Sequence, residues 1–82
     1  MYIEEVKTIL TEVLHLGAAG AALNAASNLL GALPELDSMA VVMLIGALEE
    51  RFGILVDDDE ISAATFDTLG SLAAFVAEKA AQ

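Results

Sequence analysis

Apolar residues recur at helical spacing at the start of the chain and predict an amphipathic helix over residues 3–16. Polar residues, among them Glu4, Glu5 and Lys7, fill the positions between them. A repeat of this kind places the apolar side chains on one face of a helix. Gly17 is a natural stop for such a helix. The repeating apolar residues are Ile3, Val6, Leu10, Val13 and Leu14.

A long connection rich in small residues follows, from Ala18 to Pro34. It can hold a loose helical turn or two before Pro34 fixes the backbone. Residues 13–34 carry no formally charged side chain, which raises the question of a membrane span. Because the segment is rich in Ala and Gly, with His, Asn and Ser side chains in between, we predict no membrane span.

A second helix is predicted over residues 38–52. Asp37 is a good N-cap residue, and Gly53 follows the segment as a C-terminal stop. The first turns, MAVVMLIGAL, are apolar on all sides. Only some of these side chains can face the core, so the surplus must face a partner, a ligand or a crowded core. The predicted buried line is Leu44, Leu48 and Phe52, and the surplus comes from Val41, Met43 or Ile45.

The last third of the chain predicts a linker, a short helix and a final long helix. Residues 54–56 are apolar but have no second strand to pair with, so we interpret them as an extended linker. The acidic run at 57–60 suits the first turn of a short helix. Asp67 or Thr68 can cap the last helix. Its predicted inward stripe is Leu69, Leu72, Ala73, Val76 and Ala80. We therefore predict an all-α fold with three main helices and one short helix.

Length and composition indicate one small domain. The chain has 82 residues, of which 57% are apolar, so one modest core can form. Its formal net charge of -10 makes nucleic acid a poor partner and favours basic protein partners. It has no cysteine, so any thiol chemistry must be imported. The first residues, MYIEEVKTIL, lack the basic start and apolar centre of a secretion signal, so we expect a cytoplasmic protein.

Ser38 is the main candidate for chemistry. A serine nucleophile needs a base within reach and often lies in a G-x-S-x-G turn, but neither neighbour of Ser38 is glycine. The one histidine, His15, lies in another predicted helix, so we expect no catalytic residue. Ser38 can instead simply help to start the helix. The free backbone amides of a helix start also favour an attached phosphate, and Asp37 could orient a donor or a metal ion in another enzyme's active site.

Residues 36–61, LDSMAVVMLIGALEERFGILVDDDEI, resemble the phosphopantetheine attachment region of acyl carrier proteins. The resemblance lies in the Asp-Ser-Met core, the Leu-Glu-Glu near the helix end, the Phe, and the apolar and acidic linker into a short third helix. It extends over nearly the whole chain. It implies the small four-helix bundle of that family, formed by a single acyl carrier domain over residues 1–82.

The resemblance also implies a function. A separate phosphopantetheinyl transferase would move 4'-phosphopantetheine from coenzyme A onto Ser38, and the thiol of this arm would hold an acyl or aminoacyl group as a thioester. The protein itself would not be an enzyme. We expect a monomer that takes its cargo from an acyl-loading ligase or synthase and passes it to a downstream acyltransferase or synthase. Met39 and Asp37, on either side of Ser38, are expected to contact the transferase and the cofactor.

Family members are recognised chiefly through the second helix, where acidic side chains meet basic patches on partner enzymes. Glu35, Glu49 and Glu50 match that expectation. Five residues after the serine, where fatty-acid carriers usually place a glutamate, this sequence has Met43, and Ala40 stands two residues after the serine. An apolar contact would thus replace a charged one. We therefore expect a specialised carrier rather than the housekeeping carrier of fatty-acid synthesis.

Two alternative functions stay open at this point, and one further motif needs an interpretation. The chain could be an aminoacyl or peptidyl carrier, or a helical interaction domain that carries no modification. The acidic residues 57–60 could bind a divalent metal ion, since such ions choose oxygen ligands. Because the run lacks the spacing and the glycine of an EF-hand, we interpret it as a solvated helix start and predict no metal site.

Overall fold

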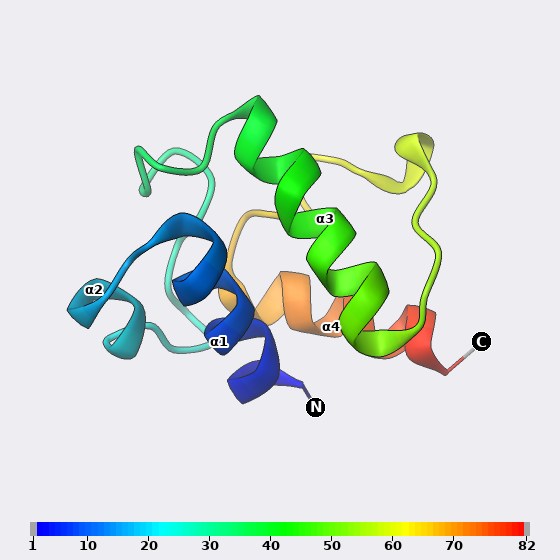
Figure 1. The fold of residues 1–82 in the computed structure, drawn as a ribbon, viewed down its shortest axis with the longest axis horizontal. Helices are drawn as coiled ribbons and strands as arrows, with labels where there is room; N and C mark the ends of the chain where they lie inside the picture. Colours follow the sequence, from blue (N-terminus) through cyan, green and yellow to red (C-terminus); the bar gives the residue numbers. More distant parts are fainter. Residues whose placement is uncertain (1, 82) are drawn as a thin grey trace.

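The computed structural model describes residues 2–81, apart from the side chain of Asp58. Three main helices, α1 (Ile3–Leu14), α3 (Ser38–Phe52) and α4 (Leu69–Ala80), surround one core (Figure 1). Two short elements join them, α2 (Ala18–Ala21) and the 3-10 helix η1 (Asp58–Glu60). The described residues form no strand, and their only β-type pairing is an isolated bridge between Asn28 and Thr68. The all-α prediction, with a short third helix at η1, is confirmed.

The three main helices begin and end close to the predicted residues. α1 ends at Leu14, two residues before the predicted end, because His15 adopts a left-handed conformation with φ 54°. α3 has the predicted bounds, with Asp37 as its N-cap and Gly53 as its left-handed C-cap. Of the two residues that could cap α4, the structure uses Thr68, whose side chain accepts a hydrogen bond from the Ser71 N–H at 3.0 Å.

The long connection between α1 and α3 is tied to the turn that precedes α4. The Leu29 N–H donates to the Asp67 carbonyl at 2.8 Å, and the Leu30 N–H donates to the Phe66 carbonyl at 3.0 Å. A third bond joins the Gly70 N–H to the Ala25 carbonyl at 2.9 Å. A Cβ atom at residue 70 would lie 2.8 Å from that same carbonyl oxygen, so the close approach needs glycine.

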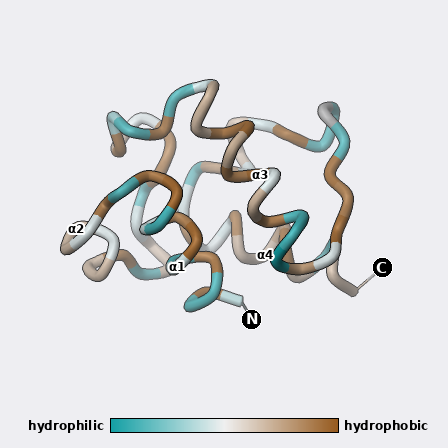
Figure 2. The backbone as a smooth tube through the Cα atoms, in the orientation of Figure 1, coloured by the Kyte–Doolittle hydropathy of each residue, from teal (hydrophilic) through white to brown (hydrophobic). Residues whose placement is uncertain are grey.

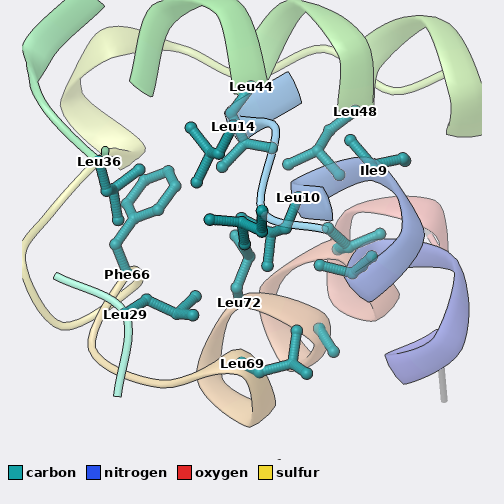
Figure 3. Close-up of a cluster of buried hydrophobic side chains, with 14 residues drawn as sticks. Ile9, Leu10, Leu14, Leu29, Leu36, Leu44, Leu48, Phe66, Leu69 and Leu72 are labelled. Carbon is teal, nitrogen blue, oxygen red and sulfur yellow. The ribbon is translucent and has the colours of Figure 1, made fainter. Parts of the chain in front are cut away.

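The core is a cluster of buried leucines with Val, Ile and Phe side chains around them (Figure 3). α1 contacts α2, α3 and α4, and α3 also contacts α4. The predicted line on α3 is largely confirmed: Leu44 and Leu48 are buried, whereas Phe52 is half-buried and packs on Tyr2 with 5.0 Å between ring centroids. The start of α1 therefore lies beside the end of α3. The predicted stripe on α4 is buried at each position except Ala80, which is partly exposed.

The surplus apolar residues of α3 divide between two environments. Val41 and Ile45 are half-buried and pack against the core, so for them the crowded core is the environment found, out of the three that the sequence left open. Met43 is 57% exposed, as expected of the surplus. Val42, which the sequence prediction did not name, is 71% exposed. None of the helices within residues 2–81 is long and apolar enough to cross a bilayer.

Candidate functional site

Ser38 is the first residue of α3 and is exposed. Asp37 is the N-cap of this helix: its Oδ1 accepts a hydrogen bond from the Ala40 N–H at 2.8 Å. Throughout the part of the chain that the structure describes, the Ser38 hydroxyl takes part in no hydrogen bond. The simple reading of Ser38 as the helix cap therefore does not hold, and its hydroxyl is free to react.

The start of α3 also presents unpaired backbone donors. The N–H groups of Ser38 and Met39 have no acceptor among residues 2–81, whereas the Ala40 N–H is bonded to Asp37 and the Val41 N–H to the Asp37 carbonyl at 2.9 Å. Free N–H groups at the positive end of a helix dipole favour a bound or attached phosphate. The residues present therefore suit a phosphate ester on the Ser38 oxygen.

Leu36 fixes the position of this helix start. Its side chain is buried beside Phe66 in the core cluster (Figure 3), and its N–H donates to the Leu33 carbonyl at 3.0 Å. The next two residues, Asp37 and Ser38, are exposed. Because a buried residue directly precedes them, the two side chains lie at the surface at a defined place above the core.

An exposed apolar surface runs along α3 from the residue after Ser38. Met39 is 74% exposed, and Val42 and Met43 follow on the same face of the helix, three and four residues further on. Figure 2 shows brown, hydrophobic residues over most of α3 and teal, hydrophilic ones near its C-terminal end. We refer to Met39, Val42 and Met43 as the apolar face of α3. An exposed cluster of large apolar side chains usually marks a contact site.

Acidic residues lie at both ends of this apolar face. Glu35 and Asp37 are exposed before α3, and Glu50 is exposed in its last turns. Glu50 lines a groove of about 420 Å³ between α1 and α3, with Glu12 and Arg51. The surface around Ser38 thus has an apolar centre and acidic ends.

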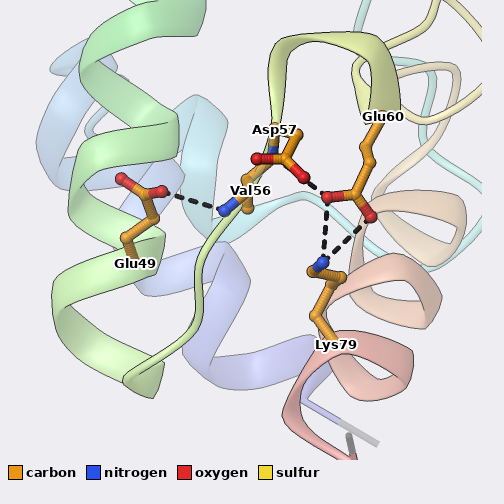
Figure 4. A network of polar contacts seen from close by, with 5 residues as sticks. All are labelled: Glu49, Val56, Asp57, Glu60 and Lys79. Atoms are coloured by element: carbon orange, nitrogen blue, oxygen red, sulfur yellow. Dashed lines mark hydrogen bonds and ion pairs between the residues drawn. The ribbon is translucent and has the colours of Figure 1, made fainter.

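Glu49 differs from the other predicted contact residues. It is half-buried, and its Oε2 accepts a hydrogen bond from the Val56 N–H at 2.9 Å (Figure 4). It also lines a groove of about 300 Å³ between α3 and the linker, together with Val42, Ile45, Gly46, Val56 and Ile61. Glu49 and Glu50 therefore line different grooves on neighbouring sides of α3. Glu50 is exposed, whereas the Glu49 carboxylate holds the linker to the helix.

The acidic run after the linker has a structural contact. The Glu60 carboxylate accepts a hydrogen bond from the Asp57 N–H at 3.0 Å and pairs with Lys79 of α4 at 2.9 Å (Figure 4). The pKa of Glu60 is lowered by that backbone hydrogen bond and by Lys79. Among the residues whose side chains the structure describes, no three His, Asp or Glu residues come together as metal ligands.

Comparisons with known proteins identify the family of the chain. The phosphopantetheine attachment site family matches residues 4–76. A holo acyl carrier protein from Nitrosomonas europaea, solved by NMR in solution, is similar to the chain at 58% sequence identity and a TM-score of 0.92. That similarity covers 100% of this chain and 99% of the other. No curated protein sequence gives a significant match.

The fold, the exposed serine at a helix start and these two matches define a class of protein that carries its cargo on a covalent arm. The chain belongs to the family of phosphopantetheine-binding acyl carrier proteins. It is a non-catalytic carrier, its cofactor is covalently attached 4'-phosphopantetheine, and it works with partner enzymes that include a phosphopantetheinyl transferase. Membership in this family disfavours the alternative of an interaction domain without modification.

Two residues of this surface were missed by sequence reasoning. Val42 is as exposed as the predicted Met39, and Gly46 is exposed in the next turn of the same helix. The spacing from Met39 to Val42 and Gly46, at three and then four residues, was visible in the sequence. It would have placed both residues on one face with Met43.

Proposed function

We propose that Ser38 is the residue to which a phosphopantetheinyl transferase attaches the 4'-phosphopantetheine arm. One observation at the start of α3 carries this proposal. Asp37 caps the helix, and the exposed Ser38 hydroxyl makes no hydrogen bond within the described residues. Ser38 would supply the ester oxygen, and the free N–H groups of Ser38 and Met39 would favour the negative charge of the phosphate. The arm supplies the thiol on which an acyl group is held as a thioester.

Asp37 and Met39 are proposed to assist at the same place. The Asp37 carboxylate, held by the Ala40 N–H, keeps one defined orientation next to Ser38. It can therefore present its outer oxygen to a metal ion or a basic group of the transferase. Met39 is 74% exposed and flexible, which suits a contact that both the transferase and later partners must make.

The partner enzymes are proposed to bind along α3. Glu35, Glu49 and Glu50 would face cationic side chains of an acyl-loading ligase or synthase and of a downstream acyltransferase or synthase. Met43 would make an apolar contact between them. The apolar residues at 40 and 43 support a specialised carrier rather than the housekeeping carrier of fatty-acid synthesis.

We further propose that residues 1–82 act as one carrier domain, as a monomer and in the cytoplasm, where coenzyme A and the transferase would be available. The single continuous core supports one domain. A net charge of -10 opposes self-association by repulsion and so supports a monomer.

The test is intact-protein mass spectrometry after incubation with coenzyme A and a broad-specificity phosphopantetheinyl transferase. The parent protein is expected to gain one phosphopantetheine, and Ser38→Ala is expected to gain none. Ser62→Ala is the matched control, because Ser62 is also exposed but lies outside α3. Modification of Ser38→Ala would refute the assignment. Loading assays with acyl and aminoacyl substrates then separate an acyl carrier from an aminoacyl or peptidyl carrier.

A further inference from the structure

Met39 and Met43 carry the only sulfur atoms among the residues that the structure describes. The chain has no cysteine and three methionines, of which Met1 lies outside residues 2–81. Met39 is 74% exposed and Met43 is 57% exposed, so small solutes in water reach both side chains. Four residues separate the two, which places them on one side of α3. The protein thus presents a pair of accessible thioethers beside Ser38.

Oxidation of this pair would change the surface of the protein and leave its core intact. Neither methionine belongs to the core cluster, whereas the next residue, Leu44, is fully buried in it. Oxidation converts the flexible apolar thioether of methionine into a polar sulfoxide. Water solvates a sulfoxide on an exposed helix face, so the fold tolerates it. A partner that covers the same side chain must remove that water, which costs free energy unless it offers a hydrogen bond.

We propose that Met39 and Met43 form a reversible oxidation site, and that their conversion to sulfoxides blocks attachment of the phosphopantetheine arm at Ser38. This inference rests on the proposed function of Ser38. Met39 directly follows Ser38, and Met43 lies about one helical turn beyond Met39. An active site that reaches the Ser38 hydroxyl therefore covers the thioethers as well. Two polar sulfoxides would then stand where the transferase meets apolar side chains.

The chemistry balances with a peroxide as the oxidant and a thiol as the reductant. The methionine sulfur attacks one oxygen of hydrogen peroxide, an S–O bond forms, the O–O bond breaks, and the other oxygen leaves as water. The thioether is oxidised and the peroxide is reduced. In the reverse direction, a thiol-dependent methionine sulfoxide reductase breaks the S–O bond, the oxygen leaves as water, and the thiols become a disulfide. Each of the two sulfoxide epimers has its own reductase, so full recovery needs both.

The test uses the chain before the arm is attached, because the thiol of the arm would otherwise be oxidised too. The parent and the double variant Met39→Leu with Met43→Leu are treated with hydrogen peroxide. Mass spectrometry of tryptic peptides locates the added oxygen, since Met1 lies in residues 1–7 and the other two methionines lie in residues 8–51. Met1 is present in both proteins and controls for oxidation elsewhere.

Two quantities are measured before and after treatment, and each protein is compared with its own untreated form. They are kcat/KM of a broad-specificity phosphopantetheinyl transferase with coenzyme A, and the thermal midpoint of unfolding. The oxidised parent is expected to lose at least about fivefold in kcat/KM. Its thermal midpoint should move by less than about 4 °C. The treated double variant should keep its own kcat/KM, and both reductases with dithiothreitol should restore the parent.

Four results would overturn the inference. The parent with both sulfoxides could be modified with unchanged kcat/KM, or the double variant could lose as much as the parent. Oxidation could unfold the parent, in which case the loss is structural. Peroxide that oxidises Met1 could leave Met39 and Met43 unchanged. If the untreated parent accepts no phosphopantetheine, the proposed function of Ser38 is refuted and this inference falls with it.

Discussion

At the scale of single residues, Asp37 and Ser38 divide two tasks: Asp37 caps α3, and the Ser38 hydroxyl stays free for modification. An N-cap serine uses its oxygen to accept from the helix backbone, which occupies the oxygen. Here Asp37 does this, bonded to the Ala40 N–H, and Ser38 begins the helix with a free hydroxyl. The pair therefore keeps the helix start ordered while leaving one oxygen available for modification.

Glu49 and Glu50 are neighbours with different tasks, and lysine substitutions should separate them. Glu49→Lys removes the acceptor of the Val56 N–H and is expected to lower the free energy of unfolding by about 1 kcal/mol. Glu50→Lys should change it by less than about 0.5 kcal/mol, because Glu50 is exposed and makes no such bond in the described chain. Urea denaturation measures both.

Glu49→Gln is the control for this pair, because its side-chain oxygen can still accept from Val56. It should stay close to the parent in stability. If Glu49→Lys and Glu50→Lys are equally stable, the hydrogen bond to Val56 contributes nothing and Glu49 is an ordinary surface charge.

At the scale of elements, α3 serves two surfaces at once. Leu44 and Leu48 bury one face in the core, while the apolar face with Met39 and Met43 remains outside. This explains why the helix is apolar on all sides without being buried on all sides. The linker after α3 is held from two directions, by Glu49 of α3 and by the pair of Glu60 with Lys79 of α4 (Figure 4).

The contact between η1 and α4 should depend on pH. The pKa of Glu60 is lowered from its ordinary value of 4.5 by the hydrogen bond from Asp57 and by Lys79. Because the pKa of Glu60 is lower in the folded than in the unfolded protein, the ionised carboxylate stabilises the fold at a pH above the unfolded pKa. This stabilisation is lost as the pH falls through the folded pKa. NMR titration of the Glu60 carboxyl is therefore expected to give a midpoint below 4.5.

Lys79→Met tests the cause of that shift. It should move the Glu60 midpoint upward but not abolish the shift, because the backbone hydrogen bond from Asp57 is the larger cause. Hydrogen exchange at residues 56–61 should become faster as Glu60 is protonated. A midpoint at or above the ordinary value in the parent would contradict the described contacts.

At the scale of the whole molecule, the stability of the protein depends on one small core. Leu10 is fully buried at its centre, and Leu10→Ala is expected to lower the free energy of unfolding by about 2–5 kcal/mol. That is a large part of the total of about 5–15 kcal/mol that is typical of a domain. Leu55→Ala is the matched control, since Leu55 is 80% exposed and should change it by less than about 0.5 kcal/mol. Equal effects in thermal unfolding would mean that Leu10 is not in the core.

The sequence predicted the three main helices because their signals are local. Helical spacing, the cap at Asp37 and the stop at Gly53 lie within a few residues of one another and need no knowledge of the rest of the fold. The same holds for Ser38, whose neighbours define the motif. The family resemblance then supplied the topology and the function.

Contacts between distant segments could not be predicted in this way. The bond from Leu29 to Asp67 and the pair of Lys79 with Glu60 join residues that only the folded chain brings together. The partial burial of Glu49 likewise depends on where the linker turns back. A pattern of charges along one helix does not show which of them the next segment will cover.

The central claim is tested most directly by locating the modification within the chain. Trypsin cleaves after Lys and Arg, so Lys7 and Arg51 bound one peptide, residues 8–51, whose serines are Ser27 and Ser38. Tandem mass spectrometry of this peptide from transferase-treated protein is predicted to place one phosphopantetheine on Ser38. Its presence on Ser27, or a peptide without any modification, would contradict the account.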